Sequence, residues 1–392
     1  MRNTRFAENF KMAGSFSKTP GSRRGLGVFV LGALLSLGAL VGAAEPTVVD
    51  VFTSGAEGYH TYRIPALIVS PKGTLLLFCE GRKTGRGDHG DLDMVLKRST
   101  DGGETWGPLQ LVYEEGGMQK ITIGNPCPVV DQSTGTIWLP LNRDNNDCLI
   151  THSSDDGRTW SKPRLITKDV KRADWGWYAM GPGNAIQLTR GEHKGRMLIP
   201  CDHRVNGKTS LQLGGRSHVI YSDDHGKTWQ LGGATGWGMN ECAVVELPDG
   251  KLLLNSRSYL GKGRRGISTS SDGGLTWSKV TSHEQLIESV CQASMIRYSW
   301  AEQGGKSRLL FSNPATTKGR HHMTVRMSYD EGRTWPVNKL VYAGSAAYSC
   351  LTVLPDKQIG MVYERDNYKK IVFTRFTLDW LTDGKDKVRE AE

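Results

Sequence analysis

Short runs of aliphatic residues, each preceded by a polar turn, recur along the chain. In a typical copy, a glycine-containing turn leads into three or four apolar residues, as in Pro71-Lys-Gly-Thr-Leu-Leu-Leu-Phe. Apolar runs this short, bounded by turn residues, are typical of buried strands rather than helices. The pattern occurs six times, at residues 71–78, 133–139, 193–199, 248–254, 304–311 and 355–362.

A second repeat, Ser-x-Asp-x-Gly-x-Thr-Trp, alternates with the first. Its Ser and Asp side chains can bond turn amides and its Gly can adopt a positive φ, so it predicts a hairpin turn. The first repeat returns about every 58 residues, which is room for four short strands and their loops. The five copies of the second repeat lie at residues 99–106, 153–160, 222–229, 270–277 and 328–335.

Together the repeats predict an all-β fold, a six-bladed β-propeller with four antiparallel strands per blade. In this prediction residues 45–392 form a single domain. The strand at Ile371–Phe376 is expected to pair with Val48–Phe52 and so to close the ring, because an unpaired edge strand invites aggregation. The 48 glycines among 392 residues agree with such a turn-rich fold.

The chain before residue 45 has a different composition. Residues 25–44 are apolar and uncharged, follow Arg23 and Arg24, and end in small residues. They predict an export signal over residues 1–44 that is cleaved near Ala44; an uncleaved membrane anchor is the alternative. The mature protein is then expected in the periplasm or outside the cell, with no integral membrane span after cleavage.

The distribution of charge and the spacing of the cysteines exclude two classes of function. About half of the formal charge of +10 comes from the first 44 residues, and the rest of the chain has no stripe of Lys and Arg. No nucleic-acid partner is therefore expected, whereas a mild positive excess suits a small anionic substrate. The seven cysteines lack metal-ligand spacing, so no metal is expected. They are expected as buried free thiols, with one disulfide as the alternative.

Polar residues gather where the first strand of a unit begins or its second strand ends. Because the strands are antiparallel, these positions converge on the rim opposite the Ser-x-Asp turns. Three arginines from separate units lie there, and guanidinium groups bind carboxylates with two parallel bonds. The residues expected on this rim are Arg63, Arg257, Arg320, Asp88, Glu241 and Tyr348.

The Ser-x-Asp repeats are Asp-boxes (BNR repeats), and with the rim motifs the chain resembles the bacterial exo-α-sialidase (neuraminidase) family over nearly all residues after 44. The resemblance implies retaining hydrolysis of terminal α-linked sialic acids from glycoproteins, glycolipids or oligosaccharides, through a tyrosyl-enzyme intermediate and without a cofactor. The matching motifs are Tyr-Arg-Ile-Pro at 62–65, Glu-Gly-Arg at 80–82, Asp-His-Gly-Asp-Leu-Asp at 88–93, Asn-Glu at 240–241, Ser-Arg at 256–257, Asn-Pro at 313–314 with Arg320, Ala-Tyr-Ser at 347–349 and Tyr-Glu at 363–364.

The resemblance also implies a role for each residue. The three arginines would bind the substrate carboxylate, and a neutral tyrosine suits an anionic substrate because a carboxylate nucleophile would be repelled. The remaining roles are nucleophile for Tyr348, its base for Glu241, acid/base for Asp88, contact near the 4-hydroxyl for Arg82 and orientation of Arg63 for Glu364.

Several alternatives accompany these assignments. Asp91 and Asp93 are rivals of Asp88 in the same loop. The segment 125–128 would line an acyl pocket or form a structural turn, and Trp175, Trp177 and Tyr178 would stack on a sugar or exclude solvent. The alternative functions are trans-sialidase-type transfer by the same site, a non-catalytic sialic-acid-binding propeller and a protein-binding scaffold.

Overall fold

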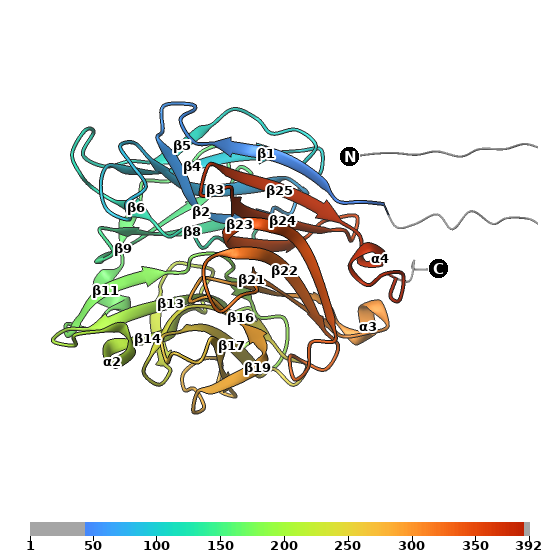
Figure 1. Ribbon diagram of the computed structural model, residues 1–392. Coiled ribbons are helices and arrows are strands. Elements are labelled where there is room, and N and C mark those ends of the chain that lie inside the picture. Colours follow the sequence, from blue (N-terminus) through green and yellow to red (C-terminus); the bar gives the residue numbers. More distant parts are fainter. Residues whose placement is uncertain (1–43, 388–392) are drawn as a thin grey trace, which may run out of the picture. The chain divides into compact units, whose positions relative to one another are not determined.

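A computed structural model describes residues 44–387, which lie in the compact unit Ala43–Glu392. The predicted export signal falls outside the described residues, apart from Ala44. The described part is almost entirely β-structure (Figure 1). Its helices are single turns: α1 (Thr167–Val170), α2 (Leu211–Gly214), α3 (Ala301–Gly304) and α4 (Leu378–Leu381). Among residues 44–387, none of the helices has the length and apolar character needed to cross a membrane.

The strands form five antiparallel sheets. The first contains β2 (Thr61–Val69), β3 (Leu75–Arg82), β4 (Leu92–Ser99) and β5 (Gln110–Tyr113). The second contains β6 (Ile123–Gly124), β7 (Val129–Val130), β8 (Ile137–Arg143), β9 (Asp147–Ser153) and β10 (Arg164–Leu165). The third contains β11 (Trp175–Met180), β12 (Ile186–Gln187), β13 (Met197–Val205), β14 (Gly215–Ser222) and β15 (Gln230–Ala234). The fourth contains β16 (Met239–Glu246), β17 (Leu252–Ser258), β18 (Arg264–Ser270) and β19 (Thr281–Ile287).

The fifth sheet has seven strands and unites the two ends of the described chain. It contains β20 (Ser294–Ser299), β21 (Arg308–Pro314), β22 (His321–Ser328), β23 (Val337–Val353), β24 (Ile359–Arg365), β25 (Lys370–Phe376) and β1 (Thr47–Thr53). In Figure 1 the blue β1 lies beside the red β25, and the register pairs Val49 with Phe373. The predicted pairing of the first strand with the last is therefore confirmed, and it covers the edge of β25.

The seven-stranded sheet differs from the expected separate four-stranded sheets. The 17-residue β23 pairs with β22 at Val337 and with β24 at Ser349. The chain continues from one ladder into the next without leaving the extended conformation, so hydrogen bonds link two ladders through one strand. The fold is a propeller-like arrangement of antiparallel sheets, with two ladders joined at this point.

The Asp-box turns are hairpin turns, as predicted: they connect β4 to β5, β9 to β10, β14 to β15, β18 to β19 and β22 to β23. They also pack against a neighbouring sheet. In the first box the indole of Trp106 lies 5.5 Å, centroid to centroid, from the ring of Phe373 in β25. A Cβ at Gly103, whose φ is 92°, would overlap that same ring. Glycine is required here because the turn needs a positive φ and the next sheet approaches closely.

The core lies between adjacent sheets. All eight residues of β3 are buried, and Leu76 and Phe78 from this strand share a cluster with Ile137 and Leu139 from β8. All seven cysteines are buried and free, which confirms the interpretation as buried thiols.

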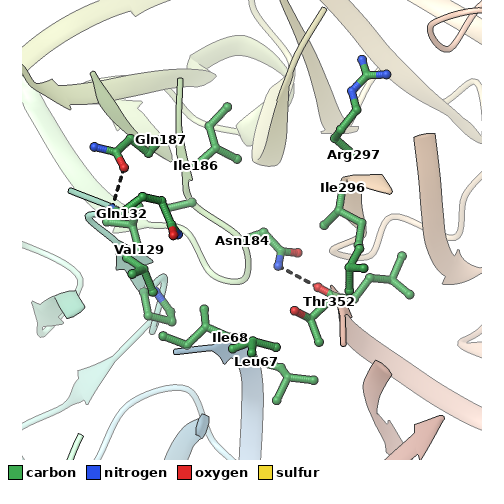
Figure 2. A pocket seen from close by; sticks show the side chains of 16 residues that line it. Leu67, Ile68, Val129, Gln132, Asn184, Ile186, Gln187, Ile296, Arg297 and Thr352 are labelled. Atoms are coloured by element: carbon green, nitrogen blue, oxygen red, sulfur yellow. Dashed lines mark hydrogen bonds between the residues drawn. The ribbon is translucent and has the colours of Figure 1, made fainter. Parts of the chain in front are cut away.

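The innermost strands surround a pocket of about 360 Å³ (Figure 2). At this pocket the Asn184 side-chain amide donates to the Leu351 carbonyl (2.9 Å), and the backbone N–H of Gln132 donates to Gln187 Oε1 (2.8 Å). The lining residues Leu67 and Leu351 follow Arg63 and Tyr348 along β2 and β23. The site residues therefore lie nearer the start of the same strands, towards the opposite rim.

Candidate active site

The predicted rim residues lie together in the structure. Arg63 is near the start of β2, Glu241 near the start of β16, and Arg257 near the end of β17. All three predicted arginines surround the ring of Tyr348. The Cζ atoms of Arg63 and Arg320 lie 5.2 and 5.6 Å from its centroid, and Arg257 Nη1 donates to its hydroxyl (3.3 Å). The cluster is thus built by β2, β16, β17, β23 and the loop before β22.

Strained backbone positions hold two of these arginines. Ile64 follows Arg63 and has a φ of 61°, at a register irregularity between β2 and β3. Val290 has a φ of 54°, and its carbonyl accepts a bond from Arg320 (3.4 Å). A β-branched residue at positive φ is strained by about 1–3 kcal/mol, and such strain concentrates at functional sites. The strain supports a ligand-binding role for this rim.

Glu364 fixes the orientation of the Arg63 side chain. Its carboxylate accepts two bonds from the Arg63 guanidinium, at 3.0 and 3.2 Å, in a bidentate arrangement. It also accepts the backbone amides of Ile64 (2.9 Å) and Tyr348 (3.1 Å). One buried carboxylate therefore ties Arg63 to the backbone beside Tyr348, which is the geometry that an orienting residue needs.

Tyr348 and Glu241 form a direct pair. The Tyr348 hydroxyl donates to Glu241 Oε1, and Arg257 Nη1 donates to Glu241 Oε2 (2.6 Å). Burial raises the pKa of Tyr348 well above its usual range and the negative Glu241 raises it further, while Arg257 opposes them. The tyrosine is therefore protonated at rest, and Glu241 is the group placed to take its proton.

Asp88 lies on the loop after β3 and faces the same cluster. Its side chain is 64% exposed, and Oδ1 accepts bonds from Arg82 (2.9 Å) and Arg63 (3.3 Å). Burial alone would raise the pKa of Asp88, but the positive charges of Arg82 and Arg63 outweigh it, and the net pKa is lowered. A solvent-exposed carboxylate beside a buried tyrosine can exchange a proton with a bound ligand.

The rival carboxylates of this loop are directed elsewhere. Asp93 accepts a hydrogen bond from the Tyr59 hydroxyl (2.6 Å) and pairs with Lys83 (3.1 Å). Asp91 also pairs with Lys83, at 3.4 Å, and is buried. Both side chains stabilise the loop, which leaves Asp88 as the carboxylate in contact with the arginine cluster.

The structure gives Arg82 a position that the sequence did not predict. Its side chain is only 2% exposed and is paired with Glu80 (2.6 Å). Its Nη1 donates to Asp88 and to the carbonyl of Gly87 (2.9 Å each). Arg82 thus holds the Asp88 loop, and the predicted contact near a sugar 4-hydroxyl stays a prediction.

A cavity of about 230 Å³ opens beside Tyr348 and Glu241. Asn125 and Trp177 line it, whereas Trp175 stacks on the buried His203 with ring centroids 3.4 Å apart. Of the aromatic residues in this segment, Trp177 is thus placed to meet a ligand, and Trp175 and Tyr178 are buried.

Two residues of the site were missed in the sequence. Tyr368 stacks on Arg63, with Cζ 4.4 Å from the ring centroid, and accepts a bond from Arg320 (3.2 Å). Asp202 lines the cavity, accepts a bond from Asn240 (2.6 Å) and is fully buried. Burial, reinforced by the charge of Glu241, raises the pKa of Asp202 well above its usual range. Asp202 could have been found from the sequence, because it is an acidic residue directly after the apolar run 197–201. No sequence pattern pointed to Tyr368.

Comparison with known proteins places this chain in a family. Residues 53–363 match the model of the BNR repeat-like domain. The chain is 38% identical to a sialidase from Micromonospora viridifaciens over 374 residues, which cover 88% of this chain and 56% of that protein. It is 32% identical to an exo-alpha-sialidase from Aspergillus fumigatus, with 83% of this chain and 86% of that protein covered.

A solved structure gives the same result for the fold. The Hadza microbial sialidase Hz136 superposes with a TM-score of 0.78 at 32% identity, and the match covers 85% of this chain and 69% of that one. The chain spans only about half of the Micromonospora protein, so its match there is to part of a longer polypeptide. On the repeat-domain match and these identities, the chain belongs to the sialidase family of BNR-repeat proteins.

Proposed function

We propose that this chain is an exo-α-sialidase, a glycoside hydrolase that removes terminal α-linked sialic acids from glycoconjugates with retention of configuration. One observation supports the proposal above all others: three arginines surround a buried tyrosine that is hydrogen-bonded to a glutamate. The names of the relatives agree with this activity.

The arginines suit a substrate that has a carboxylate on its reacting carbon. Arg63, Arg257 and Arg320 would bind this carboxylate, and each charge-assisted hydrogen bond contributes about 1.5–3 kcal/mol where water is excluded. Because Glu364 already holds Arg63 by two bonds, the guanidinium need not be ordered when the substrate arrives.

The chemistry then divides into two displacements. The Tyr348 oxygen attacks the anomeric carbon, its proton passes to Glu241, and the leaving oxygen takes a proton from Asp88 as the glycosidic bond breaks. Asp88, now ionised, takes a proton from water, which attacks the same carbon and displaces the Tyr348 oxygen; Glu241 returns the proton to that oxygen. Two inversions at one carbon give retention, and Tyr348, Glu241 and Asp88 are the protein groups that take part, with water as the second nucleophile.

In this scheme Asp88 must be protonated when the substrate is bound. This requires that the substrate raise its pKa above the value in the free enzyme. At rest, Arg63 and Arg82 lower its pKa. A bound carboxylate would occupy Arg63 and bring negative charge close to Asp88, and the leaving group would exclude water. Each of these changes raises the pKa of a carboxyl, so substrate binding would prepare the acid.

The architecture proposed for this site is a six-bladed propeller. The pairing switch within β23 divides the seven-stranded sheet into two four-stranded ladders, β20–β23 and β23–β24–β25–β1. With the four other sheets, this division gives six blades. We also propose that residues 1–44 direct export to the periplasm or the medium, which amino-terminal sequencing of the recovered mature protein would test.

A fluorogenic sialoside and its methyl ester test the function. The wild-type protein should hydrolyse the acid, release the α-anomer first by NMR, and hydrolyse the ester far more slowly because the arginines lose their anion. A 3-fluorinated sialosyl fluoride should label Tyr348. Equal hydrolysis of acid and ester, or an adduct on another residue, would overturn the proposal.

A further inference from the structure

A second cavity borders Tyr368, a residue that also contacts the arginine cluster. It has a volume of about 370 Å³, within the range of small-molecule pockets. Tyr368 belongs to both, because it lines this cavity while its ring contacts Arg63 and its hydroxyl accepts from Arg320. The residues that line the cavity are Ser54, His60, Thr61, Arg86, Asn367, Tyr368 and Lys369.

This cavity is lined by cationic side chains and by no carboxylate. Arg86 and Lys369 are exposed, and neither has an ion pair among residues 44–387. The Arg86 side chain makes one long bond, from Nη1 to the Asn367 carbonyl (3.5 Å). His60 adds an imidazole, which contacts Thr61 Oγ1 (2.7 Å).

The carboxylates nearest in sequence to these residues already have partners. Glu57 pairs with Lys97 (2.7 Å), and Asp88 pairs with Arg82 (2.9 Å). Asp366 pairs with Arg365 (3.1 Å) and accepts from the Tyr342 hydroxyl. The positive charge in the cavity is therefore not neutralised from its own walls, which favours an anionic ligand.

The backbone also holds this cavity in a defined shape. Asp366, Asn367 and Tyr368 are three consecutive residues with positive φ, at 56°, 54° and 66°. The turn is tied down by bonds from Ser54 Oγ to the Tyr368 carbonyl (2.8 Å) and from the Ser54 amide to the Lys369 carbonyl (2.9 Å). A strained turn fixed in this way keeps Tyr368 and Lys369 in place before any ligand binds.

The position relative to Asp88 indicates which part of a substrate could reach it. Arg86 is two residues before Asp88 on the same loop, and Arg82 binds the carbonyl of Arg86 (2.5 Å) as well as the Asp88 carboxylate. In the proposed reaction Asp88 protonates the leaving oxygen, so this loop faces the leaving group. A negative charge on the leaving sugar would therefore lie on the side of Arg86 and Lys369.

We propose that the cavity between Arg86 and Lys369 is a subsite for an anionic group on the leaving sugar, such as the carboxylate of a second sialic acid or a sulfate ester. The inference rests on the proposed sialidase function and assigns a substrate preference to the same enzyme: glycans with a further negative charge next to the cleaved sialic acid.

Three substrates and three variants test it. The substrates are 3′-sialyllactose, with a neutral leaving group, an α2,8-linked disialyl lactose, and a sialyl lactose with a sulfate on its galactose. The variants are the double variant Arg86→Gln/Lys369→Gln, the single variant Arg86→Gln, and Lys262→Gln as the control for net charge. Lys262 is an exposed lysine in the loop between β17 and β18.

The double variant should lose about 5- to 20-fold in kcat/KM on the charged substrates, since exposed ion pairs contribute modestly, and stay within about twofold on 3′-sialyllactose. The control should leave all three rates unchanged, and the wild-type preference should shrink as salt is added. Loss on both charged substrates indicates a general anion subsite, and loss on the disialyl substrate alone indicates a carboxylate subsite. Equal effects on charged and neutral substrates would overturn the inference, while failure of the wild type to cleave 3′-sialyllactose would overturn the proposed function itself.

Discussion

Replacing Glu364 by glutamine removes the charge that holds Arg63 and changes little else. Each oxygen of the Glu364 carboxylate accepts two N–H donors: Oε1 from Arg63 and Ile64, and Oε2 from Arg63 and Tyr348. The amide of a glutamine must present its NH₂ to one of these pairs. Whichever way it is oriented, two buried donors lose their acceptor.

The size of the expected loss in stability and in kcat/KM follows from the burial of the Arg63–Glu364 pair. The side chains of Arg63 and Glu364 are 8% and 1% exposed, so the pair is shielded from water. Removing one partner of a buried ion pair costs about 3–5 kcal/mol, and we expect the free energy of unfolding to fall by that amount. An Arg63 side chain that is no longer fixed also loses most of a contact worth about 1.5–3 kcal/mol, which corresponds to about 10- to 100-fold in kcat/KM.

Glu246→Gln is the matched control. Glu246 is also buried, lies at the far end of β16 from Glu241, and accepts bonds from the amides of Thr189 (2.9 Å) and Arg190 (2.8 Å). Both variants should unfold at lower urea concentration, but only Glu364→Gln should lose kcat/KM on a fluorogenic sialoside per folded molecule. If Glu364→Gln keeps kcat/KM within twofold of the wild type, the orienting role is wrong.

Two further predictions concern the nucleophile and the Asp-boxes. Tyr348→Phe should keep the wild-type melting temperature within a few degrees and lower kcat by at least 1,000-fold, since the step that forms the covalent intermediate is lost; steady-state kinetics with thermal unfolding measures both. Asp272→Ala should lower the melting temperature with little change in kcat. Burial raises the pKa of Asp272, but bonds from Thr276 and Ser270 outweigh it and hold it at about 2. The stabilisation is then present above about pH 4 and lost as the pH falls towards 2, so the difference in melting temperature should shrink over that range.

The fold could be predicted from local sequence because its signals are repeated. Each Asp-box contains its own turn chemistry: Ser270 Oγ donates to Asp272 (2.7 Å) and accepts from the Gly274 amide (2.9 Å), all within five residues. The shared strand β23 could not be predicted in the same way. Whether two ladders remain separate depends on the path of the backbone between Val337 and Val353, which no local pattern encodes.

The site residues were predictable where polar side chains occur at the ends of strands. They were less predictable where a residue's role depends on how deeply its side chain is buried or on the conformation of a turn. The rim argument brought Arg63, Glu241 and Tyr348 together from strand direction alone. The sequence did not reveal that the Arg82 side chain is buried, pairs with Glu80 and holds the Asp88 loop; its contact near a sugar 4-hydroxyl stays a prediction. The rim argument also missed Tyr368, whose position depends on three residues with positive φ that are not glycine.

The resting state of Asp88 leads to a last prediction about pH. The acid must be protonated to act, and kcat/KM reports its pKa in the free enzyme while kcat reports its pKa in the complex. Arg82 and Arg63 lower the first of these, and the bound carboxylate raises the second. On a natural sialoside with a poor leaving group, kcat/KM should therefore decline with rising pH at a lower pH than kcat does.

In Asp88→Asn both declines should vanish together with most of the activity on that substrate, whereas activity on an aryl sialoside with a good leaving group should fall far less. Coincident declines of kcat/KM and kcat in the wild type would show that the substrate does not change the pKa of Asp88, and an equal loss on both substrates would transfer the role of acid to another group.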